Sequence, residues 1–132
     1  MSSQVKKSKH ILVVDDETEV LFILRAALMS LKGDVEVSTA RNGREALQKI
    51  EEGAFDLLIT DINMPGISGI ELTREVRSLN PDMQVVWITG YNHTGHLYEI
   101  GTQLGVYRCL DKPFKIGDIR ETALKALAAR EH

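Results

Sequence analysis

Short apolar runs alternate with longer amphipathic segments along the whole chain. The runs have the length and the bulky apolar residues of buried strands, and they cover residues 10–15, 35–39, 55–60, 85–89 and 106–110. Between them, apolar residues recur every three or four positions, which predicts helices over 18–31, 42–53, 68–79, 90–101 and 116–130. The pattern is least distinct over 90–101, where we expect a short polar helix.

Local signals mark several of these boundaries. Asn42 with Glu45, and Ser68 with Glu71, have the spacing of a capping box at a helix start. Gly33 is suited to the left-handed conformation that often ends a helix. The repeated order of strand and helix, with short connections, predicts a parallel sheet with helices on both faces. We therefore expect an α/β, flavodoxin-like (βα)5 fold with a five-stranded sheet in the order 2-1-3-4-5.

The composition fits a single globular domain. Of the 132 residues, 43% are hydrophobic and 27% are charged. We expect a flexible N-terminal segment over residues 1–9 and one domain over residues 10–130. A net charge of −3 lacks the basic character of nucleic-acid-binding domains, and no apolar stretch approaches the roughly 18 residues of a membrane span. With a single cysteine and no signal-peptide core, we expect a cytoplasmic protein.

Four of the predicted strands end on side chains that can carry chemistry. Asp15 and Asp16 end the first strand, Asp61 follows the third, Thr89 ends the fourth and Lys112 follows the fifth. Ligands bind at the carboxyl ends of the strands in open α/β sheets, so we expect these groups to meet. Crowded carboxylates repel one another unless a cation lies among them, and their oxygens suit Mg²⁺ or Ca²⁺. The pattern predicts a site for a divalent metal and a phosphoryl group.

Each of these residues alone has a plainer interpretation. Asp15 and Asp16 can cap the following helix, Asp61 can be a turn residue, and Lys112 can be a solvated loop lysine. Their combination favours a site, because a carboxylate beside bound Mg²⁺ can attack phosphorus and form an aspartyl phosphate. A cis Lys112–Pro113 bond would aim the lysine inward, although such bonds are more often trans.

The chain resembles the receiver domain of two-component response regulators, the CheY-like family. The resemblance is carried by five segments in the family's order: His10–Glu17, Ala40–Leu47, Asp56–Leu72, Trp87–Gly90 and Asp111–Phe114. Any one of these motifs is a weak signal, whereas all of them in order are a strong one. The final helix completes the family's usual length.

The resemblance implies a metal site and a phosphorylation site that share one residue. Asp61 is the expected phospho-acceptor. Mg²⁺ (or Mn²⁺) would be bound directly by Asp16, by Asp61 and by the backbone carbonyl of Asn63, with Asp15 acting mainly through water. Thr89 and Lys112 would contact the phosphoryl group.

The resemblance also implies the partners. The donor is a phosphohistidine on a sensor histidine kinase or a histidine phosphotransfer protein, or a small phosphodonor. Phosphorylation would change the conformation of the domain and so regulate an output domain or an effector. The domain would not be an enzyme beyond its own Mg²⁺-dependent phosphorylation and dephosphorylation. Family members often form homodimers through the fourth helix, fifth strand and fifth helix, and the sequence leaves the oligomeric state open.

One position departs from the family pattern. Receivers usually carry an aromatic residue three positions before the lysine, and its rotation reports phosphorylation; here that position is Cys109. Three interpretations are open. Cys109 can be a small buried residue, which is the commonest use of a free cysteine, Tyr107 or Tyr91 can act as the aromatic reporter, or the output can be read by another surface. We expect Tyr107 on the same strand face as Cys109.

Two further functions compete with the phosphorylated switch. One is a docking module that binds its partner without phosphorylation. The other is a phosphohydrolase of the haloacid dehalogenase type, which expects a second acid two residues after the nucleophile, where this chain has Asn63. A separate metal site at His93, His96 and Glu99 would need a helix there, and exposed polar residues are the simpler explanation.

Overall fold

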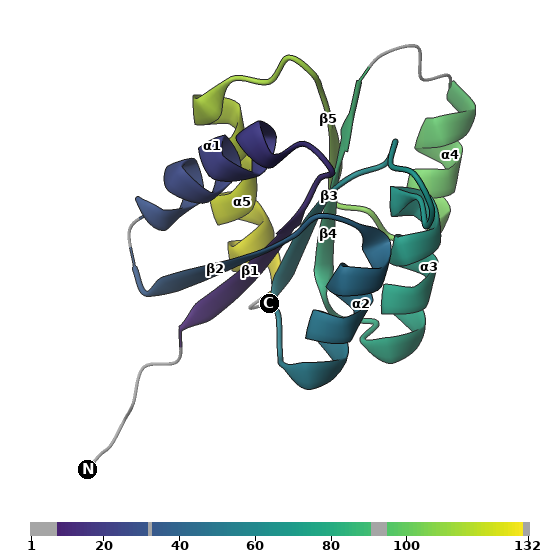
Figure 1. Cartoon of the computed structure of the whole chain (residues 1–132), viewed down its shortest axis with the longest axis horizontal. Helices are drawn as coiled ribbons and strands as arrows, with labels where there is room; N and C mark the ends of the chain where they lie inside the picture. Colours follow the sequence, from purple (N-terminus) through teal and green to yellow (C-terminus); the bar gives the residue numbers. More distant parts are fainter. Residues whose placement is uncertain (1–7, 32, 91–94, 131–132) are drawn as a thin grey trace.

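A computed structural model describes residues 8–31, 33–90 and 95–130. A central sheet lies between two layers of helices (Figure 1). In chain order the elements are Lys9–Val14 (β1), Thr18–Met29 (α1), Val35–Ala40 (β2), Gly43–Glu52 (α2), Leu57–Asp61 (β3), Gly69–Leu79 (α3), Gln84–Thr89 (β4), Gly95–Gln103 (α4), Arg108–Asp111 (β5) and Ile116–Arg130 (α5).

All five strands are parallel and follow the order β2-β1-β3-β4-β5. The predicted flavodoxin-like fold is therefore confirmed. β1 and β3 are neighbours in the middle of the sheet, so the residues that follow them leave the same edge side by side. Within the described residues, none of the helices has both the length and the apolarity needed to cross a bilayer.

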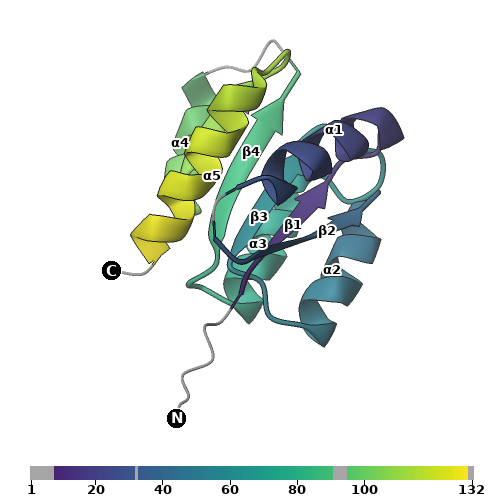
Figure 2. The same ribbon diagram turned by 90° about the vertical axis from the view of Figure 1, so that its left-hand side faces the viewer.

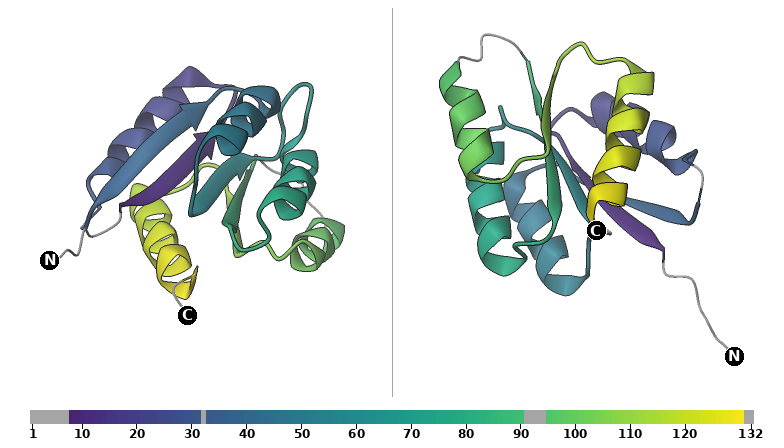
Figure 3. Two further views of the ribbon diagram at one scale, coloured as in Figure 1. Left: turned by 90° about the horizontal axis from the view of Figure 1, so that it is seen from below. Right: turned by 180° about the vertical axis from the view of Figure 1, so that it is seen from behind.

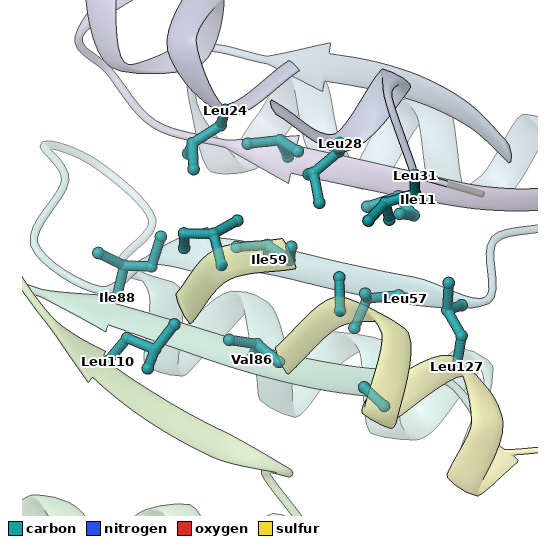
Figure 4. Close-up of a cluster of buried hydrophobic side chains, with 14 of the residues drawn as sticks. Ile11, Leu24, Leu28, Leu31, Leu57, Ile59, Val86, Ile88, Leu110 and Leu127 are labelled. Carbon is teal, nitrogen blue, oxygen red and sulfur yellow. The ribbon is translucent and has the colours of Figure 1, made fainter. Parts of the chain in front are cut away.

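One face of the sheet is covered by α1 and α5 (Figure 2). Alternate strand residues point to opposite faces, and on this face Ile11, Ile59 and Val86 pack against the two helices (Figure 4). α1 contributes a stripe of leucines that includes Leu24 and Leu28. This spacing of three to four residues is the helical period that the sequence shows.

The opposite face is covered by α2, α3 and α4 (Figure 3). Its core contains the alternate strand residues, among them Leu12, Leu58 and Trp87, together with Leu72 from α3 and Leu97 from α4. Because both faces are buried, the central strands are apolar throughout, as expected of a parallel sheet. Polar groups are therefore found mainly at the strand ends.

The helix starts agree with the capping signals, with one difference. At α3, Ser68 and Glu71 form the predicted reciprocal capping box. At α2, the Asn42 side chain accepts the Glu45 N–H at 2.8 Å, but the Glu45 carboxylate accepts the N–H of Arg41 instead of that of Asn42. Gly33 has the expected positive φ, 99°, but α1 ends at Met29 with Ser30 as its C-cap, so Gly33 lies in the connection to β2 and does not end the helix as predicted.

Several predicted boundaries differ from those observed. β1 begins at Lys9, within the segment that we expected to be flexible, and residues 1–7 of that segment lie outside the described part of the chain. β5 begins at Arg108, two residues later than predicted. Tyr107 therefore precedes the strand, and its placement within it was wrong. β5 is an edge strand whose first residue is exposed, so its apolar pattern is weak.

Arg77 joins two connections that lie at the amino-terminal ends of β4 and β5, away from the carboxyl edge of the sheet. Its guanidinium donates to the carbonyls of Met83 (2.6 Å) and, at 3.3 Å, Pro81 in the α3–β4 connection, and to those of Leu104 (2.6 Å) and Gly105 (3.0 Å) after α4. Burial lowers the pKa of Arg77 from its usual value, against the opposing charge of Asp82. One side chain thus satisfies backbone carbonyls in both of the connections that follow α3 and α4.

We expect Arg77→Met to lower the free energy of unfolding by about 2 kcal/mol, because the carbonyls of Leu104 and Met83 lose charge-assisted hydrogen bonds in a part-buried environment. Urea unfolding followed by circular dichroism measures this change. Arg74→Met is the matched control, since Arg74 is exposed on the same helix and should change stability by less than about 0.5 kcal/mol. Equal effects of the two substitutions would contradict the role of Arg77.

Candidate functional site

Three aspartates meet at the carboxyl edge of β1 and β3. Asp15 and Asp16 follow β1, and Asp61 is the last residue of β3. One carboxylate oxygen of each lies within 4.8 Å of the other two. Asp15 and Asp61 are buried, with 0% and 4% exposure, whereas Asp16 is exposed. The structure thus brings together the acids that the strand ends predict.

The two buried carboxylates are each held by a backbone N–H group. Asp15 Oδ1 accepts from Glu17 N–H at 2.8 Å, and Asp61 Oδ1 accepts from Asn63 N–H at 2.9 Å. In each case the donor is two residues further along the chain, as in the local turns that aspartate favours. These bonds fix one oxygen of each carboxylate and leave the other oxygen facing the cluster.

The Lys112 ammonium bridges these remaining oxygens. Its Nζ lies 3.1 Å from Asp15 Oδ2 and 3.1 Å from Asp61 Oδ2. The Glu17 carboxylate lies 3.5 Å away on the outer side. The Lys112–Pro113 peptide bond is cis. The backbone N–H of Lys112 donates to the Thr89 carbonyl at 2.7 Å, so the lysine is fixed to the end of β4.

The charges at this site do not balance. Burial raises the pKa of Asp15, and its hydrogen bonds to the Glu17 N–H and to Lys112 only partly oppose this effect. Burial also disfavours the charged form of Lys112, but its hydrogen bonds to Asp61 and Asp15 outweigh this, so its pKa is raised. One ammonium group cannot neutralise three aspartates and Glu17. The cluster therefore fits a hard divalent cation, which prefers carboxylate oxygens.

A cavity of about 430 Å³ opens at the carboxylates and is lined by Glu17, Asp61, Asn63, Gly90 and Lys112. Thr89, the residue before Gly90, ends β4 and is buried. The cavity thus lies where the ends of β3, β4 and β5 meet. Its size and charged lining suit a small anionic group next to a cation.

Gly69 supports Asp61 from behind, and the sequence analysis did not identify it. A side chain at this position would overlap the carbonyl oxygen of Asp61 and lie 2.6 Å from Cα of Ile62. The Gly69 N–H donates to the Ile62 carbonyl at 3.2 Å. The available signal was a glycine at the first position of a helix, where it lowers helix propensity without a local benefit.

An apolar pocket beside the cavity was also missed. It has a volume of about 730 Å³ and shares Gly90 and Lys112 with the acidic cavity. Its other lining residues are apolar: Val20, Ile23, Pro113, Phe114 and Ile116. The signal in the sequence is the run Leu21–Leu24, which is more apolar than one buried stripe of α1 requires.

Cys109 lies on β5 directly opposite Trp87 on β4. It is half-buried and packs against the core on the α3 and α4 side of the sheet. Tyr107, one of the expected aromatic reporters, is 38% exposed, and the other, Tyr91, lies outside the described residues. His93, of the expected second metal site, is also outside them. Its other members, His96 and Glu99, form an exposed pair at 3.4 Å.

The chain belongs to the response regulator receiver domains, because the model of the response regulator receiver domain family matches residues 11–124. The sensor protein EvgS of Escherichia coli (strain K12) is 36% identical over 122 residues, which are 92% of this chain and 10% of EvgS. The response regulator receiver protein CpdR of Brucella abortus is 32% identical over 92% of this chain and 98% of its own length. The chain thus spans only a small part of EvgS but nearly all of CpdR.

Solved structures agree with this assignment. A CheY-like response regulator receiver domain protein from Methanospirillum hungatei superposes with a TM-score of 0.87 at 31% identity, over 95% of this chain and 98% of that one. The response regulator TrrA from Thermotoga maritima, in complex with Mg²⁺-BeF, gives a TM-score of 0.77 at 36% identity, over 89% and 98% of the two chains. This chain is a receiver domain of the two-component response regulators.

The Cys109 thiol should be unreactive at neutral pH. Burial, followed by the negative charge of Asp111, raises its pKa to about 11. The protonated thiol is therefore favoured in the folded chain, and stability should fall as pH rises towards that value, where the unfolded chain has already lost the proton. We expect iodoacetamide at pH 8 to alkylate the folded chain at least about ten-fold more slowly than the urea-unfolded chain, because only the thiolate reacts. Equal rates, with Cys109→Ser as the blank, would contradict this assignment.

Proposed function

We propose that the domain is a phosphorylation-controlled switch in which Asp61 accepts a phosphoryl group from a phosphohistidine donor. The observation that carries the proposal is the position of the Asp61 carboxylate, which lines an open cavity and lies 3.1 Å from Lys112 and close to two further acids. A buried carboxylate with this much negative charge around it is stabilised only with a cation. The resemblance to TrrA, which was solved with Mg²⁺-BeF, supports the same site.

The proposed metal ligands are Asp15, Asp16, Asp61 and the backbone carbonyl of Asn63, with Mg²⁺ or Mn²⁺ as the ion. When bound, the ion would neutralise charge on the transferring phosphoryl oxygens. Asp15 is fully buried, which fits an indirect role through water. Asp16 is exposed to solvent, which fits direct binding of the ion. Asn63 lines the cavity beside Asp61.

In the transfer step, a carboxylate oxygen of Asp61 forms a bond to phosphorus as the phosphorus–nitrogen bond of the donor breaks. The electron pair of the broken bond stays on the ring nitrogen, and the leaving imidazole takes up a proton. Lys112, already bonded to Asp61, is placed to balance the charge on the phosphoryl oxygens. Thr89, at the end of β4, is the proposed hydroxyl donor to the same group.

Phosphorylation would replace the single negative charge of the Asp61 carboxylate with roughly two on the phosphoryl group and so change the hydrogen bonds of the cluster. The domain would then regulate an output domain or an effector, and we place this role in the cytoplasm. The only covalent chemistry proposed for the domain is its own phosphorylation and dephosphorylation.

We expect wild type with Mg²⁺ and acetyl phosphate to gain one phosphoryl group per chain, measured by intact-protein mass spectrometry. Asp61→Asn should reduce this gain at least about 100-fold, because the nucleophilic carboxylate is lost. The control is Asp34→Asn, an exposed aspartate just before β2 at the opposite edge of the sheet. Unchanged phosphorylation of Asp61→Asn would contradict the proposal. Partner binding that survives this substitution would support the docking module, and sustained phosphate release would support a hydrolase.

The apolar pocket next to the acidic cavity is the proposed binding site for the protein that carries the phosphohistidine. A donor that delivers a phosphoryl group to Asp61 must contact the rim of the acidic cavity, and this pocket shares Gly90 and Lys112 with that rim. α1 exposes Phe22 and Ile23 beside the pocket. Apolar side chains of this size contribute about 1.5–3 kcal/mol each when fully buried, which is enough to seat a partner transiently.

We expect Ile23→Ser to slow phosphoryl transfer from an autophosphorylated histidine kinase that acts on the wild-type chain by about ten-fold, because apolar contact is lost. Phosphorylation by acetyl phosphate should be unchanged, since that donor is small enough to enter the acidic cavity alone. Met29→Ser is the control: Met29 is 52% exposed on the same helix but does not line the pocket. Equal slowing of both donors would contradict a docking role.

A further inference from the structure

A buried hydrogen-bond chain runs from the backbone behind Asp61 to the indole of Trp87. The Thr73 hydroxyl donates to the Gly69 carbonyl at 2.8 Å, and Trp87 Nε1 donates to the Thr73 hydroxyl at 2.8 Å. Thr73 is 0% exposed and Trp87 is 1% exposed. A buried hydroxyl that both donates and accepts fixes both of its partners, because neither can turn to water instead.

The part of this hydrogen-bond chain next to Asp61 is closely packed. Gly69 packs so closely on the Asp61 carbonyl that no Cβ would fit, and its N–H is bonded to Ile62. A displacement of the Asp61 backbone therefore has to move Gly69. The Asp61 carboxylate has both of its oxygens engaged, one by Asn63 N–H and one by Lys112. Adding a phosphoryl group to either oxygen must replace one of these bonds.

At its other end, the hydrogen-bond chain reaches a pocket between α4 and β5 through Trp87. The pocket has a volume of about 180 Å³, and its walls include Trp87, Gly101 of α4 and Cys109 of β5. The far edge of the indole approaches Gly101 so closely that a Cβ there would lie 3.4 Å from Trp87 Cζ3. Trp87 therefore touches α3 through its N–H and α4 through its ring, beside the small side chain of Cys109.

We propose that the Thr73 hydroxyl couples Asp61 to Trp87, so that the phosphorylation of Asp61 is read at the pocket between α4 and β5. Thr73 is a positioning residue in this scheme, since it contacts neither the metal site nor the phosphoryl group. The inference rests on the proposed function. It assigns the reporter role to Trp87 on β4, because Cys109, at the usual reporter position on β5, has no aromatic ring.

Trp87 is the only tryptophan of the chain, so its indole N–H gives a single resonance in a ¹⁵N-labelled sample. Beryllofluoride with Mg²⁺ is the probe, and ¹⁹F NMR shows separately whether it is bound. In wild type, we expect the probe to shift the indole resonance. In Thr73→Val the probe should still bind, but the shift should fall below about half of its wild-type size, because the bridging hydroxyl is gone.

Two controls separate coupling from general disturbance. Thr73→Ser keeps the hydroxyl and should restore the wild-type shift. Thr122→Val removes another buried helical hydroxyl, on the opposite face of the sheet, and should leave the shift unchanged. If Thr73→Val does not fold, Trp87→Phe replaces the indole with a smaller phenyl ring and so removes the N–H that donates to Thr73, and the probe-induced shifts of the Gly101 and Cys109 amides should then be reduced in the same way.

The outcomes are distinct. An indole that does not respond in wild type with the probe bound overturns the coupling and leaves the proposed function standing. A full wild-type response in Thr73→Val, or in the Gly101 and Cys109 amides of Trp87→Phe, also overturns the coupling. A wild-type chain that binds no beryllofluoride overturns the proposed function and this inference with it.

Discussion

The contact of Lys112 with Asp15 and Asp61 is the interaction on which the rest of the site depends. Two like charges about 4 Å apart at an effective dielectric constant of 20 repel by about 4 kcal/mol, and these carboxylates are buried. The parallel sheet forces them together, since β1 and β3 are neighbours and end at the same edge. The ammonium group offsets part of this repulsion and leaves the remainder for a cation. The fold itself therefore creates a cluster of negative charge that fits a divalent cation.

The fold and the acidic cluster were predictable from the sequence for one physical reason. The sheet is parallel and buried on both faces, so its central strands are continuous apolar runs. Because the strands are parallel, the carboxyl ends of these runs lie at the same edge. The residues that follow the runs, such as Asp15, Asp61 and Lys112, must then share one edge. Where this logic weakens, the prediction was less accurate. β5 is short and begins with an exposed residue, and its start was placed two residues early, with Tyr107 inside it.

The features that the sequence analysis missed depend on contacts between elements. Gly69 is required by the close approach of α3 to the Asp61 carbonyl, which no local pattern encodes. The Trp87–Thr73 bond joins residues of β4 and α3 that are 14 positions apart, and threonine in a helix carries no signal of its partner. Trp87 is part of the core, and its one polar atom, the indole nitrogen, also gives it a specific hydrogen-bond partner. Such pairs become visible only when the layers are assembled.

The hydrogen bonds of Arg77 at the amino-terminal ends of β4 and β5 constrain how the domain can move. It ties the end of α3 to the turn that follows α4, so the last residues of α4 are anchored to the same backbone that starts β4. The first residues of α4 lie at the other end of this 9-residue helix, on the side of the carboxyl edge of the sheet. A helix held at one end behaves as a lever with its fulcrum at that end. Trp87 approaches α4 at Gly101, close to the held end, so a small displacement there would become a larger one at the start of the helix.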